Sequence, residues 1–526
     1  MIKKWKFWRR FLIGVFTTFL LLFTIVIITL VWYQDKAVQK IVNAFNDDFR
    51  GAIVIGGTDI SPFANFPYVS VVIENVQVYE DKADMFATIL EVSHIYLGFN
   101  FWTLLGGNVN VNLLKIENGY FDIVRYLDGS FNLANALSGE KKIKDIKDEY
   151  NIELQKIELT NLDIIKYDEG TNIHAETYIE SATSRFKNAE NTLMIGLESQ
   201  FILNVIIDGD STIFKNKHFD ANTELDYNKE NGILTIHPSK IKLKNGVFGI
   251  DGSIDVLDDF NIDLKIHGNN PNFNLLIAFA PEELIPTLEQ YENAGKIFFD
   301  ATIKGKSMSG YHPAVNAEFG CDSAYFSNPV SNKKLEQIAF RGNYTNGEAR
   351  DLTTMEFVLE NVTAKPEAGT FLADLRIKNF ESPEIDMSVT SNFDLDFLAK
   401  FLNVTSLQNL DGDVSIKMNF RDIIDLQNPE KSLEEFSQSY FSELEVKDLT
   451  FKLPEYHLTF DSIDIKASMD GNHANIEYFF LNLGNSDVTV RGEIDDLPAI
   501  IHQTSDEINA NLFIYSSLLN IKELTS

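Results

Sequence analysis

Apolar and polar residues alternate along most of this chain. In NVNVNLLKI (108–116), the apolar Val109, Val111 and Leu113 alternate with asparagines. The same period of two recurs in six further segments: 68–79, 260–268, 384–390, 413–420, 457–469 and 486–494. Such a period is typical of a β-strand with one apolar and one polar face. The pattern predicts an antiparallel all-β protein.

Asn-Gly and Asp-Gly pairs bound these segments. They are Asn118-Gly119, Asp128-Gly129, Asn245-Gly246, Asp251-Gly252, Asp411-Gly412 and Asp470-Gly471. Both members of such a pair tolerate positive φ, so each pair is predicted to close a tight hairpin.

Helix signals are few and short. They lie at 281–291, 393–402 and 430–441, where Ser432 and Glu435 have the spacing of a capping box. A further amphipathic helix is predicted over 34–51, since Val38, Ile41, Val42 and Phe45 have helical spacing.

The amino terminus carries the longest apolar segment. Residues 11–33 contain no charge, and 23 residues of helix at about 1.5 Å each span a bilayer core of roughly 30 Å. Tryptophans precede the segment, and Trp32 and Tyr33 end it, as expected at the two membrane interfaces. A cleaved signal peptide would have a shorter apolar region of about 7–15 residues. We therefore expect a retained transmembrane helix at 11–33, preceded by a basic cytoplasmic segment at 1–10 and followed by an exported body.

The exported body is predicted to have one boundary and an internal repeat. Residues 139–150 are dense in mixed charge, so this charged linker is expected to separate an amino-terminal β domain (34–138) from a repetitive β region (151–526). Within that region, related segments begin near Gly252, Leu375 and Gly492. The repeat would place its next landmark glycine beyond Ser526, so the chain is expected to stop partway through a module.

The charge balance narrows the choice of partners. The chain has a formal net charge of −32, and this acidity makes nucleic acid a poor partner. Cys321 is the single cysteine, so neither an intrachain disulfide nor a cysteine-rich zinc site is expected. It is predicted to be a small buried apolar residue.

No pattern of catalytic residues is recognisable. The nine histidines are scattered, none lies in an HExxH motif, and neither a phosphate loop nor a nucleophile elbow occurs. Carboxylates are so abundant that a glycosidase-like pair has no diagnostic value. We expect no enzyme, no cofactor and no metal site.

The amino-terminal region resembles the AsmA family of envelope proteins of Gram-negative bacteria. The resemblance lies in ISPFANFPYVSVVIENVQVY (60–79), ILEVSHIYLGFNFWTLLGG (89–107) and VNVNLLKIENGYFDIVRYLDGSFNL (109–133), which follow a single membrane span. It implies an inner-membrane-anchored periplasmic protein with an amino-terminal part similar to the chorein-type start of lipid-transfer proteins. It further implies a β groove that carries phospholipid and a contribution to outer-membrane assembly.

The apolar strand faces must be covered, either by a second sheet in a closed sandwich or by acyl chains in a long, curled, open groove. The resemblance favours the groove, with phospholipid as the partner. The residues predicted to line it are Val69, Val71, Ile73, Val109, Val111, Leu113, Ile262, Leu264 and Ile266. The alternative function is a tethered scaffold or regulator that binds envelope assembly proteins through its acidic outer face.

Overall fold

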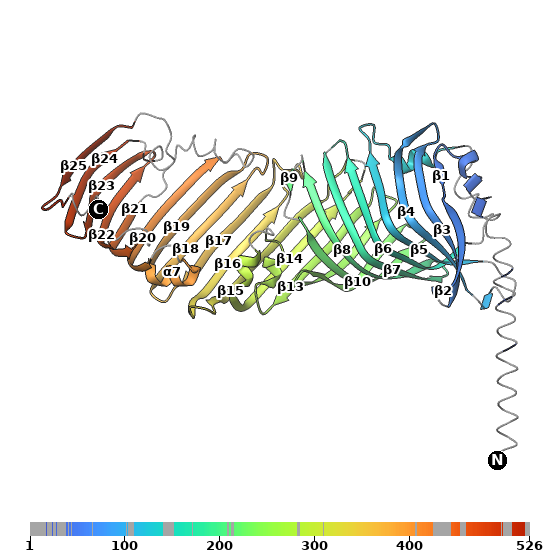
Figure 1. The fold of residues 1–526 in the computed structure, drawn as a ribbon, viewed down its shortest axis with the longest axis horizontal. Helices are drawn as coiled ribbons and strands as arrows, with labels where there is room; N and C mark the ends of the chain where they lie inside the picture. Colours follow the sequence, from blue (N-terminus) through green and yellow to red (C-terminus); the bar gives the residue numbers. More distant parts are fainter. Residues whose placement is uncertain are drawn as a thin grey trace, which may run out of the picture. The chain divides into compact units, whose positions relative to one another are not determined.

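In a computed structural model, the chain forms two compact units of β-strands with a few short helices (Figure 1). The first unit contains residues 1–244, 250–260 and 308–310, and the second contains residues 245–249, 261–307 and 311–526. The structure describes residues 17, 24, 28, 38, 39, 42, 43, 45–65, 67–100, 102–103, 110–139, 152–170, 172–207, 210–211, 215–280, 285–308, 310–404, 408–423, 443–452, 459–495, 497 and 508–520.

The strands of the first unit follow one another along the chain with few interruptions. They are β1 (Ala52–Val54), β2 (Gly57–Asn65), β3 (Tyr68–Asp81), β4 (Asp84–Asn100), β5 (Val111–Arg125), β6 (Ile152–Asp168), β7 (Ile173–Ala189), β8 (Thr192–Ile207), β9 (Asp210–Ser211), β10 (Lys217–Asn228) and β11 (Ile233–Leu243). β12 (Gly246–Asp255) has residues in both units.

Each strand of the first unit pairs with its neighbours in one open sheet. β3 pairs with β1, β2 and β4, and the order then runs through β5, β6, β7 and β8 to β10 and β11, with β9 also paired to β8. All of these pairings are antiparallel except β5–β6, which is parallel.

The parallel pair lies on either side of the predicted charged linker. Residues 126–151 connect β5 to β6 and include the predicted linker 139–150, and parallel neighbours require a crossover connection rather than a hairpin. The described part of this crossover includes the short helix α3 (Asn132–Ala136). Strands on both sides of the charged segment therefore belong to one sheet, and 140–150 itself lies outside the described residues.

The second unit repeats this architecture with antiparallel pairings. Its strands are β13 (Asn261–Asn270), β14 (Glu292–Gly305), β15 (Ala314–Asn328), β16 (Lys333–Thr345), β17 (Glu356–Lys365), β18 (Gly369–Lys378), β19 (Glu384–Asp394), β20 (Gln408–Ile423), β21 (Glu443–Lys452), β22 (Thr459–Asp470), β23 (His473–Leu483), β24 (Ser486–Ile494) and β25 (Ala510–Tyr515). Consecutive strands pair in chain order from β13 to β25.

Three short helices interrupt the strands of the second unit: α5 (Asn274–Ile277), α6 (Ile285–Glu289) and α7 (Leu395–Leu402). The Asp394 carboxylate caps α7 by accepting a hydrogen bond from the Phe397 N–H at 2.7 Å, and Asn403 ends it with a left-handed φ of 56°. α7 confirms the helix predicted at 393–402, and α6 lies within the one predicted at 281–291. The segment 430–441 lies outside the described residues.

The predicted open antiparallel sheet is confirmed, because within each unit the strands pair in sequence and no second sheet faces them among the described residues. Among the described residues of each unit, the alternative of a closed sandwich is not observed. The two chain segments aligned as a repeat also share their structure: β13 is followed by α5 and α6, and β19 by α7, before the next strand begins.

Three of the predicted hairpin pairs lie inside strands instead. Asn118-Gly119 is within β5, Asp251-Gly252 within β12 and Asp411-Gly412 within β20. Asp128-Gly129 and Asp470-Gly471 are turns, as predicted, with positive φ at both glycines.

In-strand residues with positive φ displace the side-chain alternation. In the first sheet, Asn75, Asn118 and Asn161 have φ of 48°, 56° and 51°. Asn118 and Asn161 are neighbours on β5 and β6, and the Asn161 amide donates to the Asn118 side-chain oxygen at 3.1 Å. Ile73 and Val76 flank Asn75 and contribute to the same hydrophobic cluster, although strict alternation would place them on opposite faces. These residues therefore bend the strands and keep the apolar side chains on one face.

The predicted amino-terminal helix is helical at the residues that are described between 38 and 48. Val38 and Val42 are buried against Val71 and Phe99, so the apolar side of this helix covers the start of the first sheet. The predicted span 11–33 lies outside the described residues except for three isolated positions. Among the described residues, no helix is both long and apolar enough to cross a membrane.

Candidate functional site

The apolar face of the first sheet consists of side chains aligned in rows across the strands. Side chains of directly paired residues lie on the same face. One row crosses eight strands from β3 to β11: Val76, Val92, Gly119, Leu162, Ile179, Phe201, Phe219 and Leu243. It contains no charged or polar side chain. At about 4.8 Å per strand, it extends for roughly 34 Å.

The strands of the second unit carry two such rows. The first crosses β13 to β19 at Gly268, Phe299, Phe319, Gly342, Leu359, Leu375 and Met387. The second crosses β19 to β25 at Phe393, Val414, Val446, Ile465, Phe479, Val490 and Ile514. Charged residues stand on the opposite face of the same strands, because neighbouring residues of a strand point to opposite sides.

The rows differ in exposure. Most of the first row is buried, including Val76, Val92, Leu162, Ile179 and Leu243, whereas much of the apolar face of the second unit is only half-buried. In β18, the apolar residues Phe371, Ala373, Leu375 and Ile377 are all half-buried, and the intervening residues are exposed. A second sheet packed against them would remove them from water. The described residues therefore leave part of this apolar surface accessible to solvent.

The predicted residues of β13 fit this surface. Ile262, Leu264 and Ile266 are half-buried and alternate with exposed polar residues. Ile266 begins a row that continues through Ala301 and Ala317 to Tyr344. Burial raises the pKa of the Tyr344 hydroxyl, as expected for a phenol in apolar surroundings.

The predicted residues of β3 lie under protein. Val69 and Val71 are 1% and 5% exposed, and the helix residues Val38 and Val42 pack on Val71. Ile73 is half-buried in the adjoining cluster. This part of the face is already covered by the amino-terminal helix, an arrangement that alternation alone could not reveal.

The predicted residues of β5 do not share a face. Val111 pairs with Phe99, and Leu113 pairs with Gly98, with an irregularity in register between them. The extra residue, Asn112, shifts the alternation, so Leu113 points to the opposite side of the sheet from Val111. There it is 1% exposed and packs against Gly98. Val109 lies outside the described residues.

Aromatic side chains cluster over the first strands of the second unit. Ring centroids 4.6–6.5 Å apart connect Phe248, Phe273, Phe279, Tyr291, Phe299, Phe319, Phe326, Phe340, Phe357, Phe397 and Phe401. We call this set the aromatic cluster. It joins α7 and the segments around α5 and α6 to β14–β17, so these helical segments cover part of the apolar face.

Polar contacts hold the helical segments in place. The Tyr291 hydroxyl donates to the Phe401 carbonyl at 3.0 Å, and the Asn328 amide donates to the same carbonyl at 2.8 Å. Leu275 of α5 is 0% exposed and lies over Gly268, where a Cβ would come within 3.0 Å of it. Sequence reasoning missed this cover, although the density of phenylalanine in 271–280 was a signal for it.

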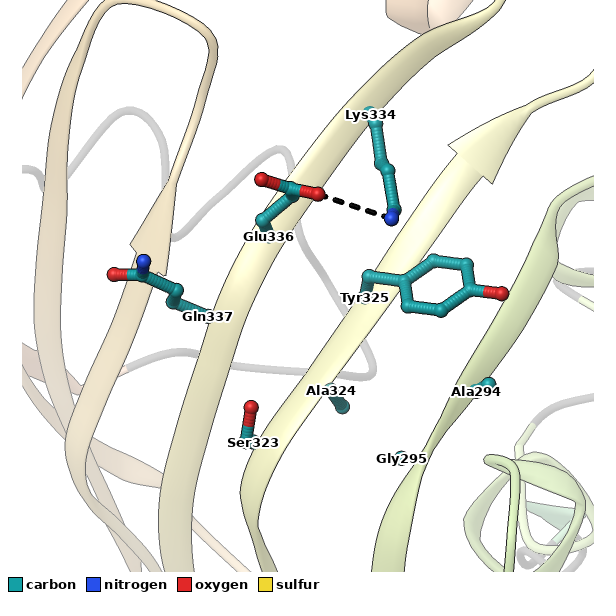
Figure 2. Close-up of a pocket in the computed structure, with 8 residues that line it drawn as sticks. All are labelled: Ala294, Gly295, Ser323, Ala324, Tyr325, Lys334, Glu336 and Gln337. Carbon is teal, nitrogen blue, oxygen red and sulfur yellow. Dashed lines mark ion pairs between the residues drawn. The ribbon is translucent and has the colours of Figure 1, made fainter.

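One shallow pocket of about 380 Å³ lies over β14, β15 and β16. Figure 2 shows the residues that line it. Lys334 forms an ion pair with Glu336 at 2.9 Å, and Tyr325 lies beside Lys334. Tyr325 neighbours Phe326 of the aromatic cluster in β15, so it points to the opposite, polar face. The pocket is thus separate from the apolar rows.

The described residues offer little for covalent or metal chemistry. None of their His, Cys, Asp and Glu side chains form a group of three that could hold a metal ion. His237 and His473 pair with Asp226 and Asp495 at 2.9 and 2.7 Å, and all four side chains are substantially exposed. Such exposed contacts are ordinary surface hydrogen bonds.

Comparison of the chain with protein-family models and with curated proteins finds no match. The apolar rows and their partial exposure therefore provide the basis for a functional interpretation.

Proposed function

We propose that the protein binds phospholipid acyl chains along its apolar sheet faces and moves lipid between membranes as an AsmA-type protein. In this proposal, residues 11–33 anchor it in the inner membrane of a Gram-negative cell and its body lies in the periplasm, where it contributes to outer-membrane assembly. The observation that carries the proposal is the half-buried apolar face of β13 and β18, which no second sheet covers within the part of the chain that the structure describes.

The free energy of burying apolar surface is large enough to bind acyl chains. Each buried CH₂ contributes about 0.8 kcal/mol, and a lipid tail occupies half of a bilayer core of roughly 30 Å. A row of seven or eight strands at about 4.8 Å each is longer than one tail. Neighbouring positions along a row are chemically alike, so a tail can shift along it without leaving apolar surroundings.

Photo-crosslinking tests the proposal with matched neighbours. A diazirine amino acid at Leu264 or Leu375 faces the apolar side, and one at Lys265 or Arg376 faces the polar side. We expect phospholipid adducts from Leu264 and Leu375 and none from the two neighbours. Equal capture from both faces, or adducts with protein alone, would refute lipid binding in the rows.

A scaffold function is the second candidate, and the exposed last strand of the second unit, β25, favours it. All six residues of β25 are exposed, including Phe513 at 74% and Tyr515 at 67%. Apolar edge strands tend to pair with other chains. Protein adducts from a crosslinker at Phe513, without lipid adducts at Leu375, would support this alternative.

A further inference from the structure

We propose that residues 271–280 cover an additional acyl-chain site, and that this segment and a lipid tail compete for the same apolar surface. Residues 271–280, which include α5, are called the cover segment. The surface beneath it includes Gly246 and Phe248 of β12, Gly268 of β13 and Phe299 of β14. The inference rests on the proposed function and assigns a site that the chain itself occupies in the absence of lipid.

The cover segment lies over the start of an apolar row. The row from β13 to β19 begins with the directly paired residues Gly268 and Phe299. Leu275 lies over Gly268, and the ring of Phe279 is 5.3 Å from that of Phe299. Farther along the same row, Leu375 is half-buried. The segment therefore occupies one end of a surface whose other end is accessible.

The cover segment has the chemistry of the ligand with which it would compete. It contains no charged residue, and seven of its ten residues are apolar, in a chain that is 44% hydrophobic. Leu275 and Ala278 are 0% and 2% exposed. An acyl chain offers the same kind of surface, and burial of apolar surface favours either occupant.

Two glycines make room for the cover segment. A Cβ at Gly246 would come within 3.3 Å of the Ala278 Cβ, and a Cβ at Gly268 within 3.5 Å of the Leu275 Cγ. The segment thus fills a hollow that exists because these two strand positions lack side chains. When the segment leaves, the hollow is open to a lipid tail.

The cover segment is tied to the strands by hydrogen bonds at its first residues. The Gly295 N–H donates to the Pro271 carbonyl at 2.9 Å, and the Phe273 N–H donates to the Asn293 side-chain oxygen at 2.8 Å. Within α5, backbone N–H groups donate to carbonyls of the same segment. The part from Asn274 onward can therefore swing away from the apolar surface while both of these hydrogen bonds to the strands persist.

Competition of this kind is reciprocal. Lipid in the site must disfavour the closed segment, and a segment fixed in the closed position must exclude lipid. A disulfide provides the fixed position: Gly246→Cys with Ala278→Cys places two Cβ atoms 3.3 Å apart, close to the roughly 3.5–4.5 Å found in disulfides. The matched control is Leu372→Cys with Thr390→Cys, a directly paired couple on the polar side of β18 and β19. Both proteins carry Cys321→Ala, so that each has only the introduced thiols.

The rate of disulfide closure tests the effect of lipid on the segment. Full-length protein is held in an amphipathic polymer with or without phosphatidylethanolamine, and a mild oxidant is added. We expect the lipid to slow closure of the 246–278 pair by about fivefold or more and to leave the control pair unchanged. Equal rates for the 246–278 pair with and without lipid would overturn the inference.

Photo-crosslinking tests the effect of the segment on lipid. With a diazirine amino acid at Phe299, we expect phospholipid adducts while the 246–278 pair is reduced. Closure of that pair should lower their yield by about fivefold or more, and closure of the control pair should leave it unchanged. Adducts at Phe299 that persist after closure would show that a tail lies beside the segment and does not replace it.

A diazirine at Leu375 in the reduced protein separates this inference from the proposed function. Capture at Leu375 together with equal closure rates refutes only the site beneath the segment. No capture at either Leu375 or Phe299 refutes the proposed function and this inference with it. If the Gly246 variant does not fold, Gly268→Cys with Leu275→Cys fixes the segment from the neighbouring strand and is judged by the same outcomes.

Discussion

At the residue scale, the bends of the strands depend on single residues with left-handed backbone, and at two of these bends a carboxylate on the neighbouring strand accepts a hydrogen bond from the displaced N–H. Asn361 has a φ of 53°, and its N–H donates to Asp374 on the neighbouring strand at 2.8 Å. Asp448 has a φ of 50°, and its N–H donates to Asp464 at 2.8 Å. The displaced amide is thus paired with the next strand rather than left without a partner.

The backbone at Asn361 gives a direct test. Asn361→Val places a β-branched residue in the left-handed region, which costs about 1–2 kcal/mol, whereas Asn361→Gly keeps that conformation available. We therefore expect urea unfolding of the second unit to shift to lower denaturant for the valine variant, with little change for glycine. A valine variant as stable as the glycine variant would show that the bend does not depend on this residue.

Cys321 provides a local reporter for such measurements. Its side chain is 0% exposed, and burial raises the thiol pKa from 9.0 to about 11. We expect iodoacetamide at pH 8 to modify it only after the surrounding strands open, so the labelling rate should rise with urea. Rapid labelling of the native protein would contradict this burial.

The same raised pKa predicts a pH dependence. The folded state holds the Cys321 proton more tightly than the unfolded chain, so this contribution to stability is complete below about pH 9 and is lost as the pH rises through about 11. The free energy of unfolding should therefore fall more steeply over this interval in the wild type than in Cys321→Ala. Parallel curves for the two proteins would argue against a buried, protonated thiol.

At the element scale, the short helical segments owe their position to packing rather than to helix propensity. α5 has four residues, too few to be stable alone, yet its Leu275 is fully buried over Gly268. The glycine leaves the space that the leucine fills. The cover of the apolar face is thus complementary in shape to the strands beneath it.

Truncation of Leu275 measures this packing. Leu275→Ala removes a fully buried side chain and should cost about 2–5 kcal/mol, because a cavity remains. Cys321 labelling in moderate urea should accelerate accordingly. The matched variant Leu372→Ala, at a position 49% exposed on the polar side of β18, should leave the labelling rate nearly unchanged. Equal rates for the two variants would mean that α5 does not stabilise this unit.

The strands and turns also show which structural features local sequence patterns can predict. The alternation of 486–494 predicts β24 with the bounds that the structure has, and that of 260–268 predicts the half-buried residues of β13. Asn118-Gly119 was predicted as a hairpin and lies within β5, because a turn and an in-strand bend need the same positive φ. Pairing with the neighbouring strands decides between them, and this is not a local property. The parallel pairing of β5 with β6 escaped prediction for the same reason.

At the scale of the whole molecule, the chain separates charge from apolar surface. The chain has a net charge of −32, but the three apolar rows, which cross seven or eight strands each, contain no charged side chain. Binding in these rows depends on burial of apolar surface rather than on charge. Lipid capture in the rows should consequently change little between low and high salt, whereas binding through the acidic outer face would weaken as salt screens it.

A charge placed within a row distinguishes a continuous path from a set of separate binding sites. Leu375 is the sixth of the seven residues in the row from β13 to β19. Leu375→Asp would set a carboxylate in the path of a moving tail, and burial of a carboxylate without a partner is strongly unfavourable. Crosslinkers at Ile266 and Val490 then report on the two sides of the block. If lipid moves along the rows, capture should persist on the side where lipid enters and fall by about tenfold or more on the other, since every 1.4 kcal/mol is a factor of ten. Arg376→Asp, on the polar face of the same strand, is the control and should leave both signals intact. Unchanged capture on both sides of Leu375→Asp would show that each region fills independently from the surrounding solution, and the protein would then be a lipid carrier rather than a path for lipid movement.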